Sequence, residues 1–194
     1  GAPSVQHGAA NLRDIEGKRV EGRNRGENPE PRGSGRLLVE EVWKEFVIMQ
    51  VPEVKVCGVT RQEDGQKAIS LGASYLGFIL FEASPRGIDP EEATGIWGKL
   101  DQGKARSVAV DVDPDPLRLA KIDSLGFDFF QLHFPSSADP ERVCQWSEIV
   151  GAERLWLAPK TPPSEPFPKQ FLPFGDTFLQ DTYSPDKFGG TGEV

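Results

Sequence analysis

The pattern of apolar and polar positions divides the chain into two parts. Residues 1–48 show almost no apolar periodicity, are rich in glycine, and carry equal numbers of acidic and basic side chains. Such a composition is typical of a disordered segment. Within it, residues 37–47 can form one or two amphipathic helical turns. We therefore predict a disordered N-terminal extension at residues 1–48 and a folded region at residues 49–194.

The single methionine, Met49, lies just before the first strand-like run of the chain. Our hypothesis is that Met49 is the natural start, and that residues 1–48 are upstream translation or an added leader. The alternative is a docking tail. A peptide from before Met49 in the mass spectrum of the natural protein would contradict the hypothesis.

After Met49, short apolar runs alternate with stretches of helical periodicity. The runs predict strands at residues 54–57, 75–80, 107–112, 128–133, 154–158 and 177–181. The stretches between them predict helices at residues 62–71, 89–100, 114–125 and 139–149, and a short helix near 169–172. Alternating strands and helices indicate an α/β fold with a parallel sheet and right-handed crossovers. A (β/α) barrel and an open doubly wound sheet both fit this pattern.

Two predicted helices carry recognisable end signals. Thr60 is a plausible N-cap for the first helix, and Gly72 is its C-terminal stop. Asp139 is a plausible N-cap for the helix at residues 139–149, with Pro140 at its first position.

The charge balance narrows the class of partner. The 194 residues carry a formal net charge of −8, whereas a nucleic-acid surface is normally basic. No run of about 18 apolar residues exists, so we expect no membrane span. The two cysteines, Cys57 and Cys144, fit no CxxC pattern, which favours a reducing, cytoplasmic compartment. A phosphorylated small molecule remains compatible, because backbone N–H groups can cradle phosphate.

Candidate chemistry lies at strand ends, where parallel α/β folds place their active sites. Cys57 ends the first predicted strand and shares a face with Lys55, which points inward in a barrel. A thiol there can act as a base or nucleophile when its surroundings favour the thiolate. The alternative is that Cys57 is a small buried apolar residue.

Asp181 ends the sixth predicted strand and shares a face with Leu179. A buried carboxyl group at this place can act as a general acid. The alternative is an aspartate that caps the turn beginning at Thr182.

Three further features are candidates for substrate binding. Arg86 follows Pro85 in the second strand–helix connection and could clamp a carboxylate or phosphate, or be an ordinary surface arginine. Gln131 and His133 share a face of the fourth strand, where a lone histidine is more often structural than catalytic. Because His7, the other histidine, lies in the N-terminal extension, we expect no metal site. Residues 189–192 (GGTG) could cradle phosphate or form a flexible lid or turn.

Taken together, these pieces resemble one family. The segments KVCGVTRQEDGQKAISLGASYLGFIL, SPR, QLH and FLQDTYSPDKFGGTG occur in the order and spacing of the phosphoribosylanthranilate isomerases. The resemblance covers about residues 54–192. It implies a (β/α)₈ TIM barrel, of which about six β/α units are present, and an enzyme of tryptophan biosynthesis.

The resemblance also implies a reaction and its residues. N-(5-phosphoribosyl)anthranilate would undergo an Amadori rearrangement to 1-(2-carboxyphenylamino)-1-deoxyribulose 5-phosphate. No cofactor is implied, because the substrate's own nitrogen stabilises the intermediate, and the partner is this phosphorylated small molecule. The matching residues are Asp181 as general acid, Cys57 as general base, Arg86 at the anthranilate carboxylate, and Gln131, His133, Gly189 and Gly190 as further substrate-binding residues.

Several positions depart from the family pattern. Asp111 stands where an apolar residue is usual, and Phe134 follows His133 where glycine is usual, so the fourth loop is expected to differ in shape. Gln180 replaces an aliphatic residue on the helix-facing side of the sixth strand, and Glu193 follows GGTG where lysine is common.

The largest departure is that a family member continues for two more strands and helices beyond Val194. We therefore expect residues 1–194 alone not to be an efficient isomerase. The alternative function is a truncated barrel that binds a phosphorylated ligand or a protein partner without catalysis. A different sugar-phosphate isomerase is disfavoured by the presence of Arg86, Cys57 and Asp181 together. The sequence gives no oligomeric state.

Overall fold

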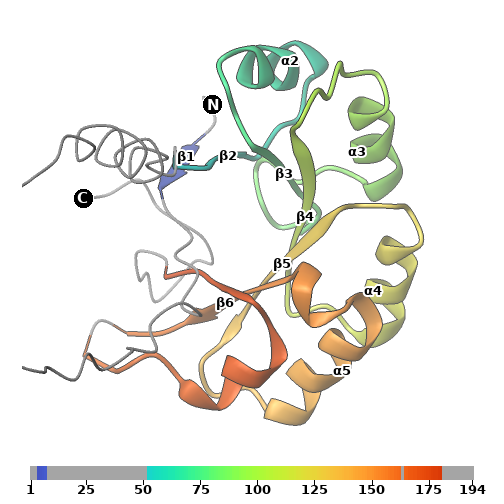
Figure 1. Cartoon of the computed structure of the whole chain (residues 1–194). Helices are drawn as coiled ribbons and strands as arrows, with labels where there is room; N and C mark the ends of the chain where they lie inside the picture. The colour runs from blue at the N-terminus through green and yellow to red at the C-terminus, as the bar shows by residue number, and fades with distance from the viewer. Residues whose placement is uncertain (1–3, 8–51, 163, 181–194) are drawn as a thin grey trace, which may run out of the picture. The chain divides into compact units, whose positions relative to one another are not determined.

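The computed structural model of the chain describes residues 4–7, 52–162 and 164–180. Apart from Pro52, these residues belong to one compact unit, which is formed by residues 1–11 and 53–194. All the elements described below lie in this unit (Figure 1).

One sheet organises the unit, and its strands follow one another in chain order from β1 to β7. Strands β2 to β7 run parallel, whereas β1 pairs antiparallel with β2. In an open doubly wound sheet the strand order reverses at a switch point, which this sheet does not do in the described residues. The order is that of a (β/α) barrel, and the predicted α/β class is confirmed. The strands are β1 (Ser4–His7), β2 (Val54–Cys57), β3 (Tyr75–Ile79), β4 (Arg106–Val112), β5 (Phe129–Pro135), β6 (Leu155–Lys160) and β7 (Thr177–Phe178).

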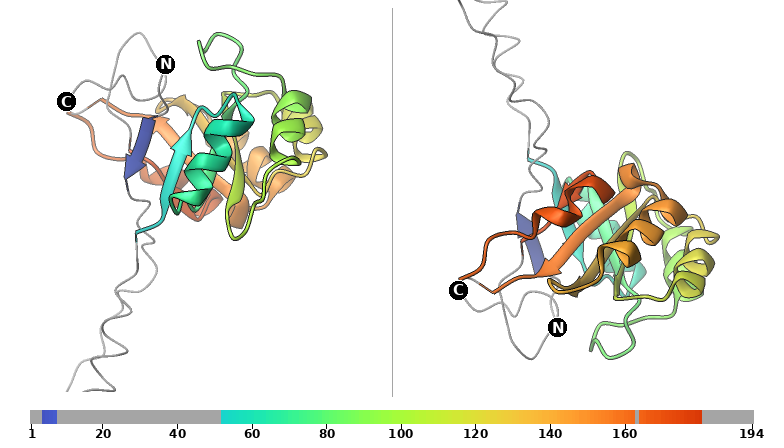
Figure 2. Two further views of the ribbon diagram at one scale, coloured as in Figure 1. Left: turned by 90° about the horizontal axis from the view of Figure 1, so that it is seen from above. Right: turned by 90° about the horizontal axis from the view of Figure 1, so that it is seen from below.

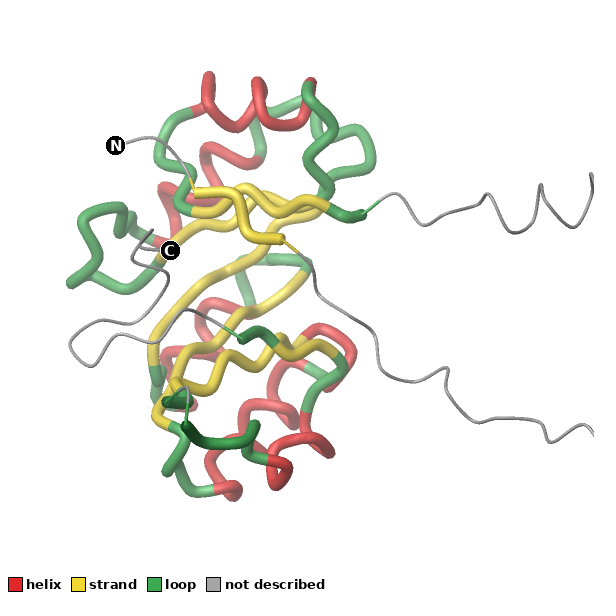
Figure 3. The backbone as a smooth tube through the Cα atoms, turned by 90° about the vertical axis from the view of Figure 1, so that its left-hand side faces the viewer, coloured by secondary structure: helices red, strands yellow, loops and turns green. Residues whose placement is uncertain are grey.

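The helices alternate with the strands and cover one face of the curled sheet (Figures 1 and 2). Figure 3 shows the same arrangement from the left-hand side of Figure 1, with strands in yellow and helices in red. None of the helices in the described ranges is long and apolar enough to span a lipid bilayer. They are α2 (Gln62–Ser70), α3 (Pro90–Trp97), α4 (Pro116–Asp123) and α5 (Pro140–Val150), with 3-10 helices η1 (Ala152–Arg154) and η2 (Lys169–Phe174).

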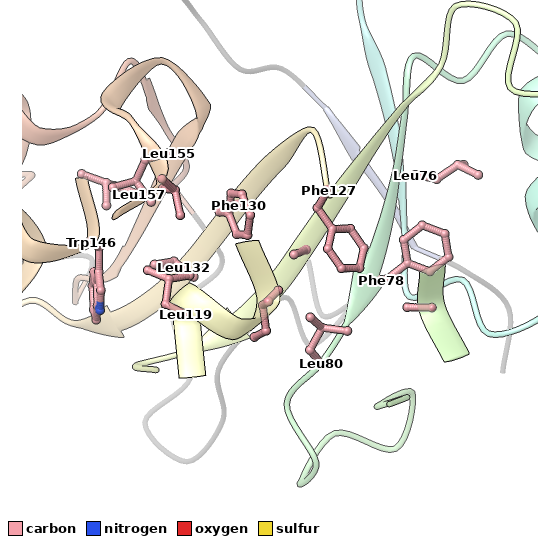
Figure 4. Packing of buried hydrophobic residues seen from close by; sticks show 14 of the residues in the cluster. Leu76, Phe78, Leu80, Leu119, Phe127, Phe130, Leu132, Trp146, Leu155 and Leu157 are labelled. Atoms are coloured by element: carbon pink, nitrogen blue, oxygen red, sulfur yellow. The ribbon is translucent and has the colours of Figure 1, made fainter. Parts of the chain in front are cut away.

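The core lies mainly between the helices and the outer face of the sheet. Side chains alternate between the faces of a strand, so every second strand residue points toward the helices. Most of these outward residues are apolar, and they pack with the inner faces of α4 and α5 (Figure 4). The labelled members are Leu76, Phe78, Leu80, Leu119, Phe127, Phe130, Leu132, Trp146, Leu155 and Leu157. A second, smaller cluster on the opposite, inner face contains Cys57, Val108, Val110 and Trp156.

Three of the four α-helices in the described residues begin with an Asp-Pro pair, in which the aspartate is the N-cap. Asp89, Asp115 and Asp139 precede α3, α4 and α5, and each carboxylate accepts a backbone N–H of the first turn. The Asp139 prediction is thus confirmed, while the helix predicted from residue 114 begins at Pro116 because Asp115 is the cap. The Thr60 prediction is wrong. The extended N-cap residue of α2 is Arg61, which makes no capping hydrogen bond and pairs instead with carboxylates of the first turn.

The last strand is shorter than predicted. It consists of Thr177 and Phe178, although the backbone N–H of Leu179 still donates to the carbonyl of Leu157 at 2.9 Å. Gln180, which replaces an aliphatic residue of the family pattern, follows the strand and is exposed, so no polar group is buried there. Asp181 lies outside the described residues.

Strand β1 was not predicted. It falls within the segment that the sequence places in a disordered extension, and it pairs with β2 from Ser4↔Cys57 to His7↔Val54. The remainder of residues 1–48 lies outside the described ranges.

The two unusual outward residues are accommodated by specific partners. Asp111 is buried on the outer face of β4, where its carboxylate accepts from the Arg118 guanidinium at 2.7 Å. Phe134 is fully buried and packs edge-on against Trp146 and Phe171. The strand therefore continues through Phe134 to Pro135 instead of turning directly after His133.

Candidate active site

The candidate residues converge on the inner face of the sheet, toward the carboxyl ends of the strands. The register aligns Cys57 with Gly77, and Val110 with Gln131. Lys55 and Cys57 both point to this face and are 5% and 4% exposed. The prediction that they share an inward face is confirmed, while Val56 packs against the outer core.

Lys55 is the connecting group of this site. Its Nζ lies 3.5 Å from Cys57 Sγ and donates a short hydrogen bond to Gln131 Oε1. The same nitrogen stands 5.9 Å from the centre of the Trp156 ring, a distance at which a cation is attracted by the aromatic face. Lys55, on β2, thus contacts the end of its own strand as well as β5 and β6.

The hydrogen bonds of Gln131 fix the state of His133. Lysine can only donate, so Gln131 Oε1 is the acceptor and its Nε2 is the donor that faces His133 Nε2 at 2.7 Å. His133 Nε2 must then be unprotonated, which assigns the proton of the neutral ring to Nδ1. Burial, and next the charge of Lys55, lower the pKa of His133 from 6.5 to about 4. The imidazole is therefore neutral at physiological pH.

Three aromatic side chains pack together on the inner face beside Lys55. Tyr75, Phe129 and Trp156 pack on one another, with ring centres 4.9 to 5.7 Å apart. Burial, together with a hydrogen bond to Glu53, raises the pKa of Tyr75 to about 12. Lys55 thus lies beside a cluster of uncharged aromatic rings.

Arg86 lies on the loop after β3, and its side chain contacts the end of β2. Its Nη1 donates to the carbonyl oxygen of Cys57 at 3.0 Å, and the side chain is only partly buried. Gly58 permits this contact: its φ is +83°, and a Cβ there would lie 2.7 Å from Arg86 Nη1. Arg86 is therefore fixed at the site by one of its N–H groups, as an ordinary surface arginine is not.

Gly77 makes room for the thiol. A Cβ at this position of β3 would lie 2.8 Å from Cys57 Sγ and 3.0 Å from Lys55 Cε. A larger residue would therefore displace both side chains.

Trp156 and Lys160 belong to the same inner face but were not singled out from the sequence. Both follow from strand alternation along β6, because Trp156 pairs with Gln131 and Lys160 with Pro135. The register of neighbouring strands, which the sequence alone does not provide, is what places them beside the other residues.

Three predicted site residues, Asp181, Gly189 and Gly190, lie outside the described residues. Among the residues that are described, no group of three or more His, Cys, Asp or Glu side chains is placed to hold a metal ion.

The arrangement offers a defined set of chemical functions. A thiol beside an ammonium can accept a proton as a thiolate. A partly exposed guanidinium at the rim can bind a carboxylate or phosphate in a bidentate manner. The amide and neutral imidazole can hydrogen-bond substrate hydroxyls. Together these groups fit proton transfer on a polar, anionic small molecule.

Residues 54–157 match the family model of N-(5′-phosphoribosyl)anthranilate (PRA) isomerase. The chain is 39% identical over 147 residues to the N-(5′-phosphoribosyl)anthranilate isomerase of Sinorhizobium medicae, which covers 72% of this chain and 66% of that protein. It is 37% identical to the enzyme of the same name from Rubrobacter xylanophilus, with the same two coverages. The chain therefore spans just under two thirds of the length of these relatives.

Solved structures show the same similarity. The crystal structure of phosphoribosyl anthranilate isomerase from Thermotoga maritima is 27% identical and superposes with a TM-score of 0.59. That alignment covers 72% of this chain and 65% of the other.

Proposed function

Since the chain belongs to the N-(5′-phosphoribosyl)anthranilate isomerase family, we propose that it catalyses the reaction for which that family is named. N-(5-phosphoribosyl)anthranilate would be rearranged to 1-(2-carboxyphenylamino)-1-deoxyribulose 5-phosphate in tryptophan biosynthesis. The observation that carries the proposal is the meeting of the Cys57 thiol, the Lys55 ammonium and the Arg86 guanidinium at one strand end.

The reaction requires one acid step and one base step. Asp181 gives a proton to the furanose ring oxygen, the C1–O bond breaks, and the anilino nitrogen forms an iminium at C1. The thiolate of Cys57 then removes the proton from C2, and the electron pair of that bond neutralises the iminium to give an enolamine. Protonation of the enolamine at C1 and loss of the proton of the C2 hydroxyl leave the ketone at C2, and no external oxidant is needed because C1 is reduced as C2 is oxidised.

Cys57 supports the base role through its position. Its Sγ lies on the inner face beside Gly77 of the neighbouring strand, and its carbonyl oxygen accepts a hydrogen bond from Arg86. A buried base faces less competition from water for the substrate proton. A base in this form needs a free thiol and a reducing compartment, which supports a cytoplasmic location.

Arg86 is the proposed partner of the anthranilate carboxylate. Within the described residues only its Nη1 is engaged, by the Cys57 carbonyl, so its other N–H groups can form a forked pair with a carboxylate. This contact would place the carboxylate at the rim and the sugar carbons over Cys57.

Gln131 and His133 are proposed to bind the sugar portion of the substrate. Because the imidazole is neutral, it can bind a hydroxyl without adding charge next to the base. Gly189 and Gly190 are proposed to bind the phosphate through their backbone N–H groups.

Genetic complementation tests the proposal. The chain is expressed in a tryptophan-requiring bacterium that lacks its own PRA isomerase. We expect growth without tryptophan, which even the inefficient turnover expected from the sequence can support, and no growth with Cys57→Ser, because losing a general base lowers the rate by roughly 10²–10⁴-fold.

Cys144 is only partly buried, and the Cys144→Ser variant is the matched control, which should support growth like the wild type. Failure of the wild-type chain to complement, combined with measurable binding of the product by the purified protein, would favour a binding role instead.

A further inference from the structure

The burial of Lys55 is a feature that the general acid and base do not explain. Its side chain is 5% exposed, and burying an ammonium is unfavourable unless charges or hydrogen bonds compensate it. Gln131 Oε1 supplies one hydrogen bond, and the Trp156 face supplies a cation–π contact. Neither of these partners carries a formal charge.

A counter-charge for Lys55 is not found among the carboxylates that the structure describes. In residues 52–162 and 164–180 no aspartate or glutamate forms an ion pair with its Nζ. The remaining contact is Cys57 Sγ at 3.5 Å, which can become a charge by losing its proton.

We propose that Lys55 is a positioning residue of the isomerase, whose ammonium stabilises the thiolate of Cys57 and orients Gln131 so that His133 remains the neutral Nδ1–H form. This inference rests on the proposed function for its role in turnover, while its effect on the thiol can be measured independently.

The other charged groups around the thiol are few. On the loop after β3, Arg86 contacts the backbone carbonyl of Cys57 rather than its sulfur. On β5, His133 is neutral because burial and Lys55 hold its pKa at about 4. Strands β3 and β4 present Gly77, Val108 and Val110, and β6 presents Trp156 and, at its end, Lys160. In the described site, Lys55 is thus the cation in direct contact with the sulfur.

The decisive experiment is an ultraviolet titration of the Cys57 thiolate. The absorbance of the Cys57→Ser variant is subtracted at each pH, from mildly acidic to mildly alkaline, so that Cys144 and the tyrosines cancel. We expect the thiolate absorbance at neutral pH to fall in Lys55→Met, because this variant removes the cation that lies 3.5 Å from Cys57 Sγ. Lys55→Arg should restore part of the signal.

Two further variants make the result interpretable. Lys104→Met removes the same charge from an exposed turn and should titrate like the wild type. Lys55→Gln keeps a donor for Gln131 without the charge, and it replaces Lys55→Met if circular dichroism shows that the methionine variant does not fold.

Turnover separates this inference from the proposed function. The acid limb of the kcat/KM profile should move to higher pH in Lys55→Met, in parallel with the thiolate signal. Thiolate titrations that superimpose for wild type, Lys55→Met and Lys55→Gln would overturn the inference even if the wild type is an active isomerase. An inactive wild type with a shifted thiolate titration would instead overturn the proposed function and leave the Lys55–Cys57 coupling standing.

Discussion

His133 shows how a single buried side chain links the site to stability. It is the third member of the hydrogen-bonded series that starts at Lys55 and passes through Gln131. Protonation of its Nε2 would remove the acceptor for Gln131 and place a second cation near Lys55. The ring is thus held neutral by the same contacts that orient the polar groups of the site.

This environment predicts an acid-dependent loss of stability. The folded pKa of His133, about 4, lies below the reference value of 6.5, so the unfolded chain binds the proton more readily. The stability that the neutral imidazole contributes is therefore fully present above pH 6.5 and is lost as pH falls toward 4, by up to about 3 kcal/mol. Urea unfolding at several pH values measures it, and His133→Gln should flatten this part of the profile. An unchanged acid dependence in His133→Gln would contradict the assignment.

At the scale of elements, Arg118 ties helix α4 to two strands. Its Nε pairs with Asp111 of β4 at 2.7 Å, and its Nη2 donates to the Leu80 carbonyl, after β3, at 2.7 Å. Asp111 itself is 2% exposed, and burial raises its pKa against the opposing effect of Arg118. The helix is thereby fixed against the sheet by a polar contact in an otherwise apolar layer.

Replacing only one residue of the Asp111–Arg118 ion pair should destabilise the protein far more than replacing both. Arg118→Met leaves a buried carboxylate and is expected to lower the free energy of unfolding by about 3 kcal/mol, while the double variant Asp111→Leu/Arg118→Met should be close to wild type. Because the Asp111 pKa is raised, its carboxyl group is more easily protonated, and the Arg118→Met penalty should shrink as pH falls. Denaturant unfolding of the wild type, the single variants Asp111→Leu and Arg118→Met, and the double variant tests this. Additive single-variant effects would contradict the coupling.

Local sequence signals predict the ends of some helices and strands but not of others. The bounds of β2 were predicted to the residue, and the Asp139-Pro140 entry of α5 was correct, because both depend on signals within a few residues. Thr60 failed as a cap because the backbone reaches its extended N-cap conformation one residue later, at Arg61. The predicted length of the last strand was wrong because that length is set by pairing with β6, and within residues 164–180 two residues form such pairs.

On the scale of the whole molecule, one face of the sheet packs against the helices and the other carries the residues of the candidate site. Its outer face carries the large apolar side chains that pack against the helices, and its inner face carries Lys55, Cys57, Gln131 and His133. Alternation along each strand predicts which residues share a face. The contacts between Lys55, Gln131 and Trp156 depend instead on strand register and sheet curvature, so the sequence alone could not show them.

Conversion of substrate by the purified protein in deuterium oxide tests the central claim most directly. If Cys57 removes the C2 proton and the enolamine is protonated at C1, the anthranilate fluorescence changes with turnover, and mass spectrometry finds the product with a single carbon-bound deuterium, at C1. Cys57→Ser should lower this rate by roughly 10²-fold or more. Deuterium at any carbon other than C1, or equal rates for wild type and Cys57→Ser, would contradict the account.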